Sequence, residues 1–380
     1  MNKKFMKNIF KITYSSKKSS ARTGVLKTQH GKIETPFFMP IATYGAVKTQ
    51  SSDEIKDLPS NILLSNTYHL YIRPGTEILE QAGGLHKFMN WNQIILTDSG
   101  GYQVYSLQGM RKITDDGVTF QSHLDGSKHH FTPEKVVDIQ RSIGSDIMMM
   151  LDVCPPGDAN KKKWTEAFTL TTKWALRAKK HYDKTEPLYG HYQIISPIVQ
   201  GGTDLTLRKQ SAMELIDINC DMYAIGGLAV GEPKEEMLKV VSFMDTVLPK
   251  EKPRYLMGVG TPADLVESVL NGVDMFDCVI PTRNARNSQL FSFDGKINIR
   301  NSKYKNDFSS IDENDFSLIS NKYSKAYLHH LFKTNEVLGL RIATEHNLKF
   351  YIHLMQTIRK QINNDNFESW AKNFLNRYNK

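Results

Sequence analysis

The chain has 380 residues, of which 40% are hydrophobic and 23% charged, and its mean hydropathy is −0.43. It has no uninterrupted apolar run of about 18 to 20 residues, which argues against an integral membrane protein. Its 18 Phe, 16 Tyr and 4 Trp can build a core, which argues against a disordered chain. The length fits one large α/β domain with an appendage, or two domains.

The balance of 49 Lys+Arg against 40 Asp+Glu gives a net charge of +9. This modest basic excess favours a polyanionic partner such as a nucleic acid. The three cysteines, Cys154, Cys220 and Cys278, are widely spaced, which favours neither a disulfide framework nor a cysteine-rich metal site. The basic first 18 residues lack the apolar stretch of a secretory signal, so we expect a cytoplasmic protein.

Short apolar runs from about Leu26 onward predict the strands. Each run ends at or just before Gly, Ser, Asp, Gln or Pro and is largely apolar on both faces, as expected for parallel strands covered by helices. The runs are Ile62–Ser65, Ile94–Thr97, Ile147–Leu151, Ile194–Val199, Met222–Ile225, Tyr255–Met257 and Met275–Ile280.

Helical patterns alternate with the later runs. Thr132 and Thr261 are each followed by proline, the signature of an N-cap and a first helical residue. About eight strands alternating with helices, without a GxGxxG after the first, favour a closed (β/α)8 TIM barrel over an open doubly wound sheet. The predicted helices are Pro133–Ile143, Lys163–Tyr182, Leu205–Ile218, Pro233–Val247 and Pro262–Leu270.

The alternation stops near residue 300. Asn301–Asn321 is rich in Asn, Ser and Asp, whereas Ser324–Phe332 and Phe350–Tyr378 look helical. We therefore expect an N-terminal tail over 1–20, the barrel over 21–300, an inserted small subdomain over 301–350, and a closing C-terminal helix over 351–380 that packs on the barrel.

Polar residues follow the predicted strands where each one ends. In a parallel barrel these positions meet on one rim, where catalytic residues usually lie. A single aspartate there is most often a helix cap or turn former, but three in register indicate a site. The set comprises Asp98-Ser99-Gly100-Gly101, Asp152, Gln200, Gly226-Gly227-Leu228 and Asp277.

Three carboxylates and an amide suit glycosyl transfer through a covalent intermediate, with recognition of a purine base. One carboxylate can attack an anomeric carbon, and a second can carry protons. A third, with an amide and backbone N–H groups, matches the edge of guanine. The glycine pairs make tight turns or let the backbone approach a flat ligand. Tyr102 and Met257 are either core residues or the two faces of a slot for a ring.

The segment from Thr282 to Lys305 is basic. It is either a solvated charged surface or a phosphate contact beside the predicted nucleophile. Its basic residues, against the single acidic Asp294, are Arg283, Arg286, Lys296, Arg300, Lys303 and Lys305.

Taken together, several motifs are similar to those of the bacterial-type tRNA-guanine transglycosylases. The resemblance spans about residues 20 to 378, and implies a (β/α)8 enzyme of queuosine biosynthesis. Such an enzyme replaces guanine at wobble position 34 of tRNAs with GUN anticodons by a 7-deazaguanine, without an organic cofactor. The motifs are SNTYHLYIRPG (65–75), LTDSGGYQVYSL (96–107), SHLDGSKHHFTPEK (122–135), VQGG (199–202), IGGLAVGE (225–232), MGVGTP (257–262) and MFDCVIPTRNARN (275–287).

The resemblance also implies residue roles. Asp277 would be the nucleophile on ribose C1′ and Asp98 the general acid/base. Base contacts would come from Ser99, Gly100, Gly101, Asp152, Gln200, Gly227 and Leu228, with Tyr102 and Met257 stacking on the ring. RNA contacts would come from Gly258, Val259, Gly260, Thr261, Pro262, Ala263 and Asp264, and from Thr282, Arg283, Asn284, Ala285 and Arg286.

The sequence departs from the family at its structural zinc, which three cysteines and a histidine usually hold. The corresponding positions are Asp315, Ser317, Ser320 and His346, a poor tetrahedral zinc set. We expect no metal there, and a subdomain held by packing that includes Phe316, Leu318 and Ile319. The family implies a homodimer through this subdomain, and the missing thiolates leave open whether it forms.

The incoming base is predicted from Leu228-Ala229-Val230-Gly231. The β-branched Val230 leaves little room for the cyclopentenediol of queuine and favours preQ1 (7-aminomethyl-7-deazaguanine). Val153 stands where the family commonly has a Glu, which keeps queuine salvage open. A non-catalytic tRNA-binding partner subunit and a DNA-modifying homologue are further alternatives. Cys278 is read as a small buried residue, because no nearby histidine in sequence would activate it.

Overall fold

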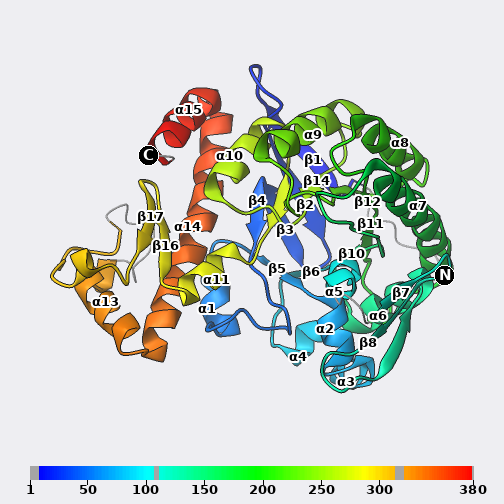
Figure 1. Cartoon of the computed structure of the whole chain (residues 1–380), viewed down its shortest axis with the longest axis horizontal. Coiled ribbons are helices and arrows are strands. Elements are labelled where there is room, and N and C mark those ends of the chain that lie inside the picture. Colours follow the sequence, from blue (N-terminus) through cyan, green and yellow to red (C-terminus); the bar gives the residue numbers. More distant parts are fainter. Residues whose placement is uncertain (1–7, 107–110, 313–320, 379–380) are drawn as a thin grey trace.

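Parallel strands arranged in a ring form the centre of the molecule (Figure 1). The computed structural model describes residues 8–106, 111–312 and 321–378. β15 pairs with β4, and a bridge between Ile41 and Leu64 joins β4 to β5. Pro197 separates β11 from β12, which follow each other in the chain. The ring therefore confirms the (β/α)8 prediction, with strands β4 (Phe37–Met39), β5 (Ile62–Ser65), β6 (Ile94–Thr97), β10 (Ile147–Met149), β11 (Ile194–Ser196) continued by β12 (Ile198–Val199), β13 (Tyr223–Ile225), β14 (Arg254–Leu256) and β15 (Met275–Asp277).

The outer helices confirm the capping signals. The hydroxyls of Thr132 and Thr261 accept hydrogen bonds from Lys135 N and Asp264 N, at 3.1 and 3.2 Å. Pro233 is an N-cap residue and not the first helical residue. These helices are α6 (Pro133–Ile143), α7 (Lys161–Lys184), α8 (Leu205–Ile216), α9 (Lys234–Val247) and α10 (Pro262–Leu270).

Shorter helices connect the first strands. They are α1 (Ser52–Lys56), α2 (Thr67–Ile72), α3 (Thr76–Ala82), α4 (Leu85–Phe88) and α5 (Gly101–Ser106). Inside the ring, Met39, Leu64, Leu96 and Met149 belong to one fully buried apolar cluster, which fills the barrel.

Three predictions about elements were wrong. The strand expected over Met275–Ile280 stops at Asp277, because Ile280 and Pro281 already begin a helix. The expected N-terminal tail contains a strand, β1 (Phe10–Ser15), which pairs with β2 (Arg22–Thr28). The closing helix is two helices, α14 (Val337–Asn363) and α15 (Phe367–Tyr378), broken where Asp365 has a positive φ of 56°.

Two small antiparallel sheets accompany the barrel. β3 (Gly31–Thr35) completes the sheet of β1 and β2 at the amino ends of the barrel strands. The second sheet consists of β7 (Arg111–Ile113), β8 (Val118–Gln121) and β9 (Lys128–Phe131).

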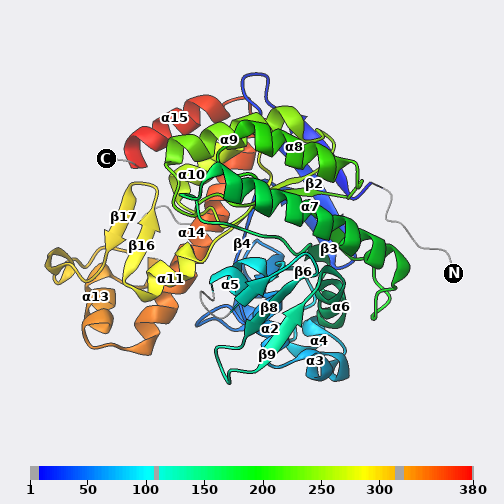
Figure 2. The ribbon, with the colours of Figure 1, turned by 45° about the vertical axis from the view of Figure 1, so that its right-hand side comes forward.

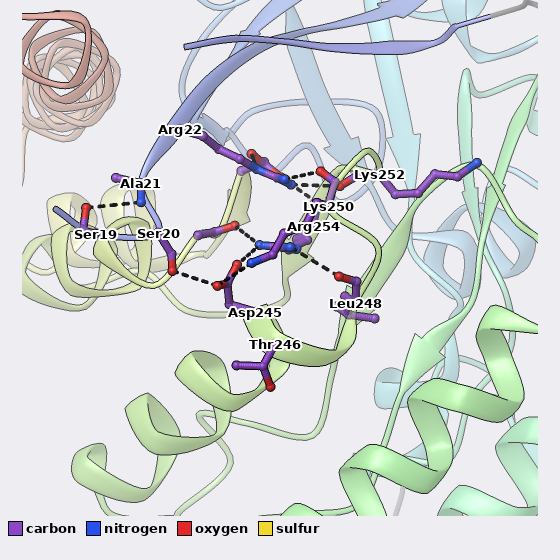
Figure 3. A network of polar contacts seen from close by, with 12 residues as sticks. Ser19, Ser20, Ala21, Arg22, Asp245, Thr246, Leu248, Lys250, Lys252 and Arg254 are labelled. Atoms are coloured by element: carbon purple, nitrogen blue, oxygen red, sulfur yellow. Dashed lines mark hydrogen bonds and ion pairs between the residues drawn. The ribbon is translucent and has the colours of Figure 1, made fainter. Parts of the chain in front are cut away.

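Buried ion pairs fasten β2 beneath the barrel (Figure 3). Arg22 donates to both carboxylate oxygens of Asp274, at 3.0 and 2.6 Å. Arg254, the first residue of β14, donates through its backbone N–H to Asp274 at 2.8 Å and through its side chain to Asp245. Ser20 donates to the second oxygen of Asp245 at 2.7 Å. We call this end of the barrel, at the amino ends of the strands, the floor.

A smaller unit lies beside the barrel, with α14 between the two (Figures 1 and 2). Its elements are α11 (Ile280–Arg286), β16 (Gln289–Ser292), β17 (Gly295–Asn298), η1 (Ser302–Tyr304) and α13 (Lys325–Lys333). They share an apolar core that includes Leu290, Ile299, Leu328 and Ile342. The predicted domain boundaries stay a proposal; α14 runs across the one at 350. No helix in the described parts of the chain is long and apolar enough to cross a membrane.

Candidate active site

A cavity of about 550 Å³ opens at the carboxyl ends of the barrel strands. Asp98, Asp152 and Asp277, which follow or end β6, β10 and β15, all line it. The structure therefore brings the three predicted carboxylates together. The other predicted residues along its wall are Ser99, Tyr102, Gly227, Leu228, Met257, Gly258, Val259, Gly260, Thr261, Asp264 and Arg283.

Asp277 is held through one oxygen only. The hydroxyl of Tyr255 donates to Oδ1 at 2.6 Å, and the backbone N–H of Gly258 donates to the same atom at 2.8 Å. No hydrogen bond from the described residues reaches Oδ2. Burial raises the pKa of this carboxyl above its usual range, although both donors oppose the shift. The arrangement fixes the carboxylate and leaves one oxygen for a ligand.

Asp98 is surrounded by neutral donors. Its Oδ1 accepts from the N–H groups of Thr67 at 2.8 Å and Gly100 at 3.2 Å. Its Oδ2 accepts from the side chains of Asn66 and, at 2.8 Å, Gln103. Burial nevertheless raises the pKa of Asp98 to about 6, because no described cation compensates its charge. A carboxyl with this pKa can both give and take a proton near neutral pH.

Asp152 and Gln200 form the inner wall. Ser99 Oγ and Gln200 Nε2 donate to the two Asp152 oxygens at 2.7 and 2.8 Å, and burial raises the pKa of Asp152. The Oε1 atom of Gln200 is buried without a hydrogen-bond partner. It lies beside Gly227, where a Cβ would come within 2.3 Å of it. This acceptor without a partner points to a ligand that brings its own donor.

Three glycines allow the backbone turns and close contacts around this wall. Gly227 has a φ of +63°, and a side chain at Gly101 would meet the carbonyl and carboxylate of Asp152 at 2.6 and 2.7 Å. Gly100 has a φ of +74° and turns the chain into α5. Gly100 and Gly101 shape the cavity without lining it, and Gln200 borders it beside Gly227, which does line it.

The outer rim carries the two predicted stacking residues. Tyr102 on α5 is 57% exposed, and Met257 is half-buried against the barrel core. Near them, the carboxylate of Glu232 accepts from the N–H groups of Ala229 and Val230, which holds the turn after Leu228. The sequence pattern did not single out Glu232.

The predicted RNA-contact residues divide into two groups. Gly258 to Thr261, Asp264 and Arg283 reach the cavity. Pro262, Ala263, Thr282 and Ala285 are buried in helices. Asn284 donates to Gln289 Oε1 at 2.7 Å, and Arg286 to the carbonyl of Thr282 at 2.8 Å.

Helix α14 supports the rim from behind. Tyr351 donates its hydroxyl proton to the carbonyl of Gly260 at 2.6 Å. Asn347 donates to the carbonyls of Pro281 and Gln289, both at 2.9 Å. One helix is thus bonded to both segments that border Asp277.

The sequence analysis did not identify several residues of the site. Asn66 and Thr67 follow β5 as Asp98 follows β6, so the same strand-end pattern could have found them. Tyr255 lies inside an apolar run and reads as a core residue. His69 lines the cavity, and burial lowers its pKa, which favours a neutral ring.

The candidate zinc positions do not fit a metal. Asp315, Ser317 and Ser320, as well as Phe316, Leu318 and Ile319, lie outside the described residues. His346 is buried in α14, with Nε2 at 2.8 Å from the carbonyl oxygen of Phe291. Two hydroxyls and a carboxylate are poor partners for it. The three cysteines are buried elsewhere, and burial raises the pKa of Cys278 to about 11, against a thiolate beside Asp277.

A (β/α)8 barrel with buried carboxylates around a cavity at its strand ends defines an enzyme of the TIM-barrel class. Comparison with known proteins then identifies the family. The model of the family described as queuine tRNA-ribosyltransferase matches residues 16–380, and the chain belongs to this family.

Curated relatives with the name queuine tRNA-ribosyltransferase cover almost the whole chain. The protein of Caldanaerobacter subterraneus subsp. tengcongensis is 52% identical over 369 residues, 97% of each chain. That of Thermoanaerobacter pseudethanolicus is 51% identical over the same shares. That of Francisella tularensis subsp. novicida is 48% identical over 97% of this chain and 99% of its own.

Proposed function

We propose that the protein exchanges guanine at wobble position 34 of tRNAs with GUN anticodons for a 7-deazaguanine, in queuosine biosynthesis. The observation that carries the proposal is the set of Asp98, Asp152 and Asp277 around one cavity. The names of its relatives, at 47–52% identity, support the same reaction. Since tRNA is the substrate, we place the protein in the cytoplasm.

The first half of the reaction forms a covalent intermediate. The target base leaves the anticodon loop stack, at a cost of a few kcal/mol that is smallest in an unpaired loop. Asp277 Oδ2 bonds to ribose C1′ while the C1′–N9 bond breaks and its electron pair goes to guanine. Asp98, in its protonated form, supplies the proton for the departing base. The sugar is then bound to the enzyme with inverted configuration.

The second half restores the configuration. Asp98 takes a proton from the incoming base, whose nitrogen attacks C1′ and displaces Asp277. Two inversions give net retention, and the kinetics are ping-pong. No metal or organic cofactor enters either step.

The base edge is recognised by the inner wall. The carboxylate of Asp152 and the unpartnered Gln200 Oε1 accept from the N–H groups of the guanine-type ring. Backbone groups at Gly227 and Leu228 lie beside its carbonyl side. Tyr102 and Met257 cover the ring faces from the rim.

We propose preQ1 as the incoming base. Val230 lines the cavity, so its branched side chain limits the space for the larger substituent of queuine. Val153 belongs to a buried apolar cluster, and its N–H bonds to Thr171 Oγ1 at 3.0 Å. The side chain at 153 thus packs into the core, away from the base.

Incubation of unmodified tRNA, and of DNA in a parallel reaction, with labelled preQ1 or labelled queuine tests both parts of the proposal. We expect label in tRNA with preQ1, and none with Asp277→Asn. Label from queuine alone would replace preQ1 and leave tRNA exchange standing. Label in DNA, or in neither polymer, would refute tRNA exchange.

We also propose that the subdomain folds without zinc. We further propose that the protein forms a homodimer, and light scattering would measure its mass in solution.

A further inference from the structure

Three histidines and an aspartate meet at the barrel floor, at the opposite end from the cavity. His30 lies in the turn between β2 and β3, His86 in α4, Asp146 directly before β10, and His191 before β11. His30 Nδ1 is 2.8 Å from Asp146 Oδ1, and His86 Nε2 is 3.3 Å from Asp146 Oδ2. The ligand-type atoms of His30, His86 and Asp146 all lie within 4.8 Å of one another. We call these three residues the floor triad.

Asp146 is a fixed centre for this group. Its side chain has no exposed surface, and its oxygens also accept from the backbone N–H groups of Ile95 at 3.0 Å and His30 at 3.3 Å. Burial alone would raise its pKa, but the two imidazoles outweigh burial and lower it. The carboxylate is therefore ionised and aimed between the two rings.

His191 gives a second, independent indication. It is only 8% exposed, and its Nε2 is buried without a hydrogen-bond partner. Its ring meets the His30 ring edge-on, with centroids 4.9 Å apart, and the His86 ring at 6.0 Å. A buried ring nitrogen without a partner is uncommon in proteins. His191 is outside the group whose ligand atoms lie within 4.8 Å of one another, but its ring packs against both histidines of the floor triad.

We propose that the floor triad binds a divalent transition-metal ion of the zinc type, with His191 as the fourth donor. Zinc takes imidazole nitrogen and carboxylate oxygen at about 2.0–2.2 Å in tetrahedral geometry, which places donors about 3.3 Å apart. His30 Nδ1, now 2.8 Å from Asp146 Oδ1, must move slightly away from it to reach this spacing. His30 and His86, whose side chains are 25% and 11% exposed, are the parts able to move.

A bound ion would replace hydrogen bonds within this group. His30 Nδ1 and His86 Nε2 lie 2.8 and 3.3 Å from the Asp146 oxygens, and His86 Nε2 also lies 2.9 Å from the carbonyl oxygen of Gln93. Coordination through His86 Nε2 would break the contact with Gln93. Nitrogen donors favour zinc over magnesium or calcium. The bound ion would join four chain segments at the floor, far from the carboxylates of the reaction.

Titration of zinc chloride into the full-length, tag-free protein, stripped with EDTA and dialysed, tests the site by calorimetry. We expect one equivalent of zinc to bind, and no binding of magnesium. His30→Gln and His86→Gln should each weaken binding at least 10-fold, and His191→Gln less. His181→Gln is the matched control, because His181 pairs with Asp138 on the surface at 2.7 Å and belongs to no group of three metal-ligand side chains among the described residues.

Three results would overturn the proposal. One is a wild-type protein that binds no zinc. Another is undiminished binding by the His30→Gln/His86→Gln double variant. The third is binding that only His346→Gln removes, which would assign the ion to the subdomain. Circular dichroism checks that each variant is folded; His30, in the turn between β2 and β3, has the most exposed side chain of the floor triad, so its substitution is the least able to disturb the fold. Base exchange by the metal-free protein should be unchanged.

Discussion

Buried aspartates have opposite pKa shifts at the two ends of the barrel. We call the end that carries the cavity the mouth, to set it against the floor. At the mouth, Asp98, Asp152 and Asp277 accept only from neutral groups, and burial raises the pKa of each. At the floor, Asp146 and Asp245 face histidine, arginine or lysine, and their pKa values are lowered despite burial. A buried aspartate whose charge is compensated by a basic side chain thus holds structural elements together. One whose charge is not compensated can take part in proton transfer or bond formation.

The largest expected effect is at the mouth. Asp277→Asn removes the only oxygen placed to attack C1′, so base exchange should fall by at least about 10⁴-fold. The free energy of unfolding should stay equal or rise at neutral pH, because an uncompensated buried charge is lost. Exchange assays and urea unfolding measure the two effects, with the exposed Asp138→Asn as control. Residual exchange above a hundredth of wild type would exclude Asp277 as the nucleophile.

The corresponding change at the floor should act on stability. Asp274→Asn leaves Arg22 without its buried partner, so the free energy of unfolding should fall by about 3–5 kcal/mol. Asp294→Asn is the control, since its pair with Arg377 is exposed and contributes little. Urea unfolding compares them. Equal small losses would show that the floor network does not anchor β2.

The pH dependence of stability should separate the two ends further. The folded-state pKa of Asp98, about 6, lies above its unfolded value, so the native state binds the extra proton. Protonated Asp98 therefore contributes about 3 kcal/mol to the free energy of unfolding below about pH 4. This contribution is lost as the pH rises through about 6. The difference in unfolding free energy between wild type and Asp98→Asn, measured from pH 4 to 8, reports this. A difference independent of pH would contradict it.

The smallest effect concerns how Asp277 is positioned. Tyr255→Phe removes the 2.6 Å bond to Oδ1 and leaves the ring, so kcat should fall about 10- to 100-fold with little change in KM for tRNA. Steady-state kinetics separates the two constants, with Tyr102→Phe as a control at the rim. A rise in KM at unchanged kcat would instead assign Tyr255 to RNA binding.

The functional residues at the mouth could be predicted from the sequence better than the ion pairs at the floor. Asp98, Asp152 and Asp277 each follow an apolar run, so the pattern of a parallel barrel brings them together. Arg22 and Asp274 are 252 positions apart, and no local pattern connects them. Tyr255 was hidden because an apolar strand residue with a polar tip looks like core. The strand Phe37–Met39, between Pro36 and Pro40, was too short to recognise.

Helix α14 has a consequence for how the molecule responds to load. Its 27 residues make a rod about 40 Å long, bonded near its middle to Gly260 and Pro281 and packed at its start against the small subdomain. A stiff rod transmits a tilt at one end to the other. The same helix therefore contacts both the core of the small subdomain and the backbone beside Asp277, so a change in its tilt would move both.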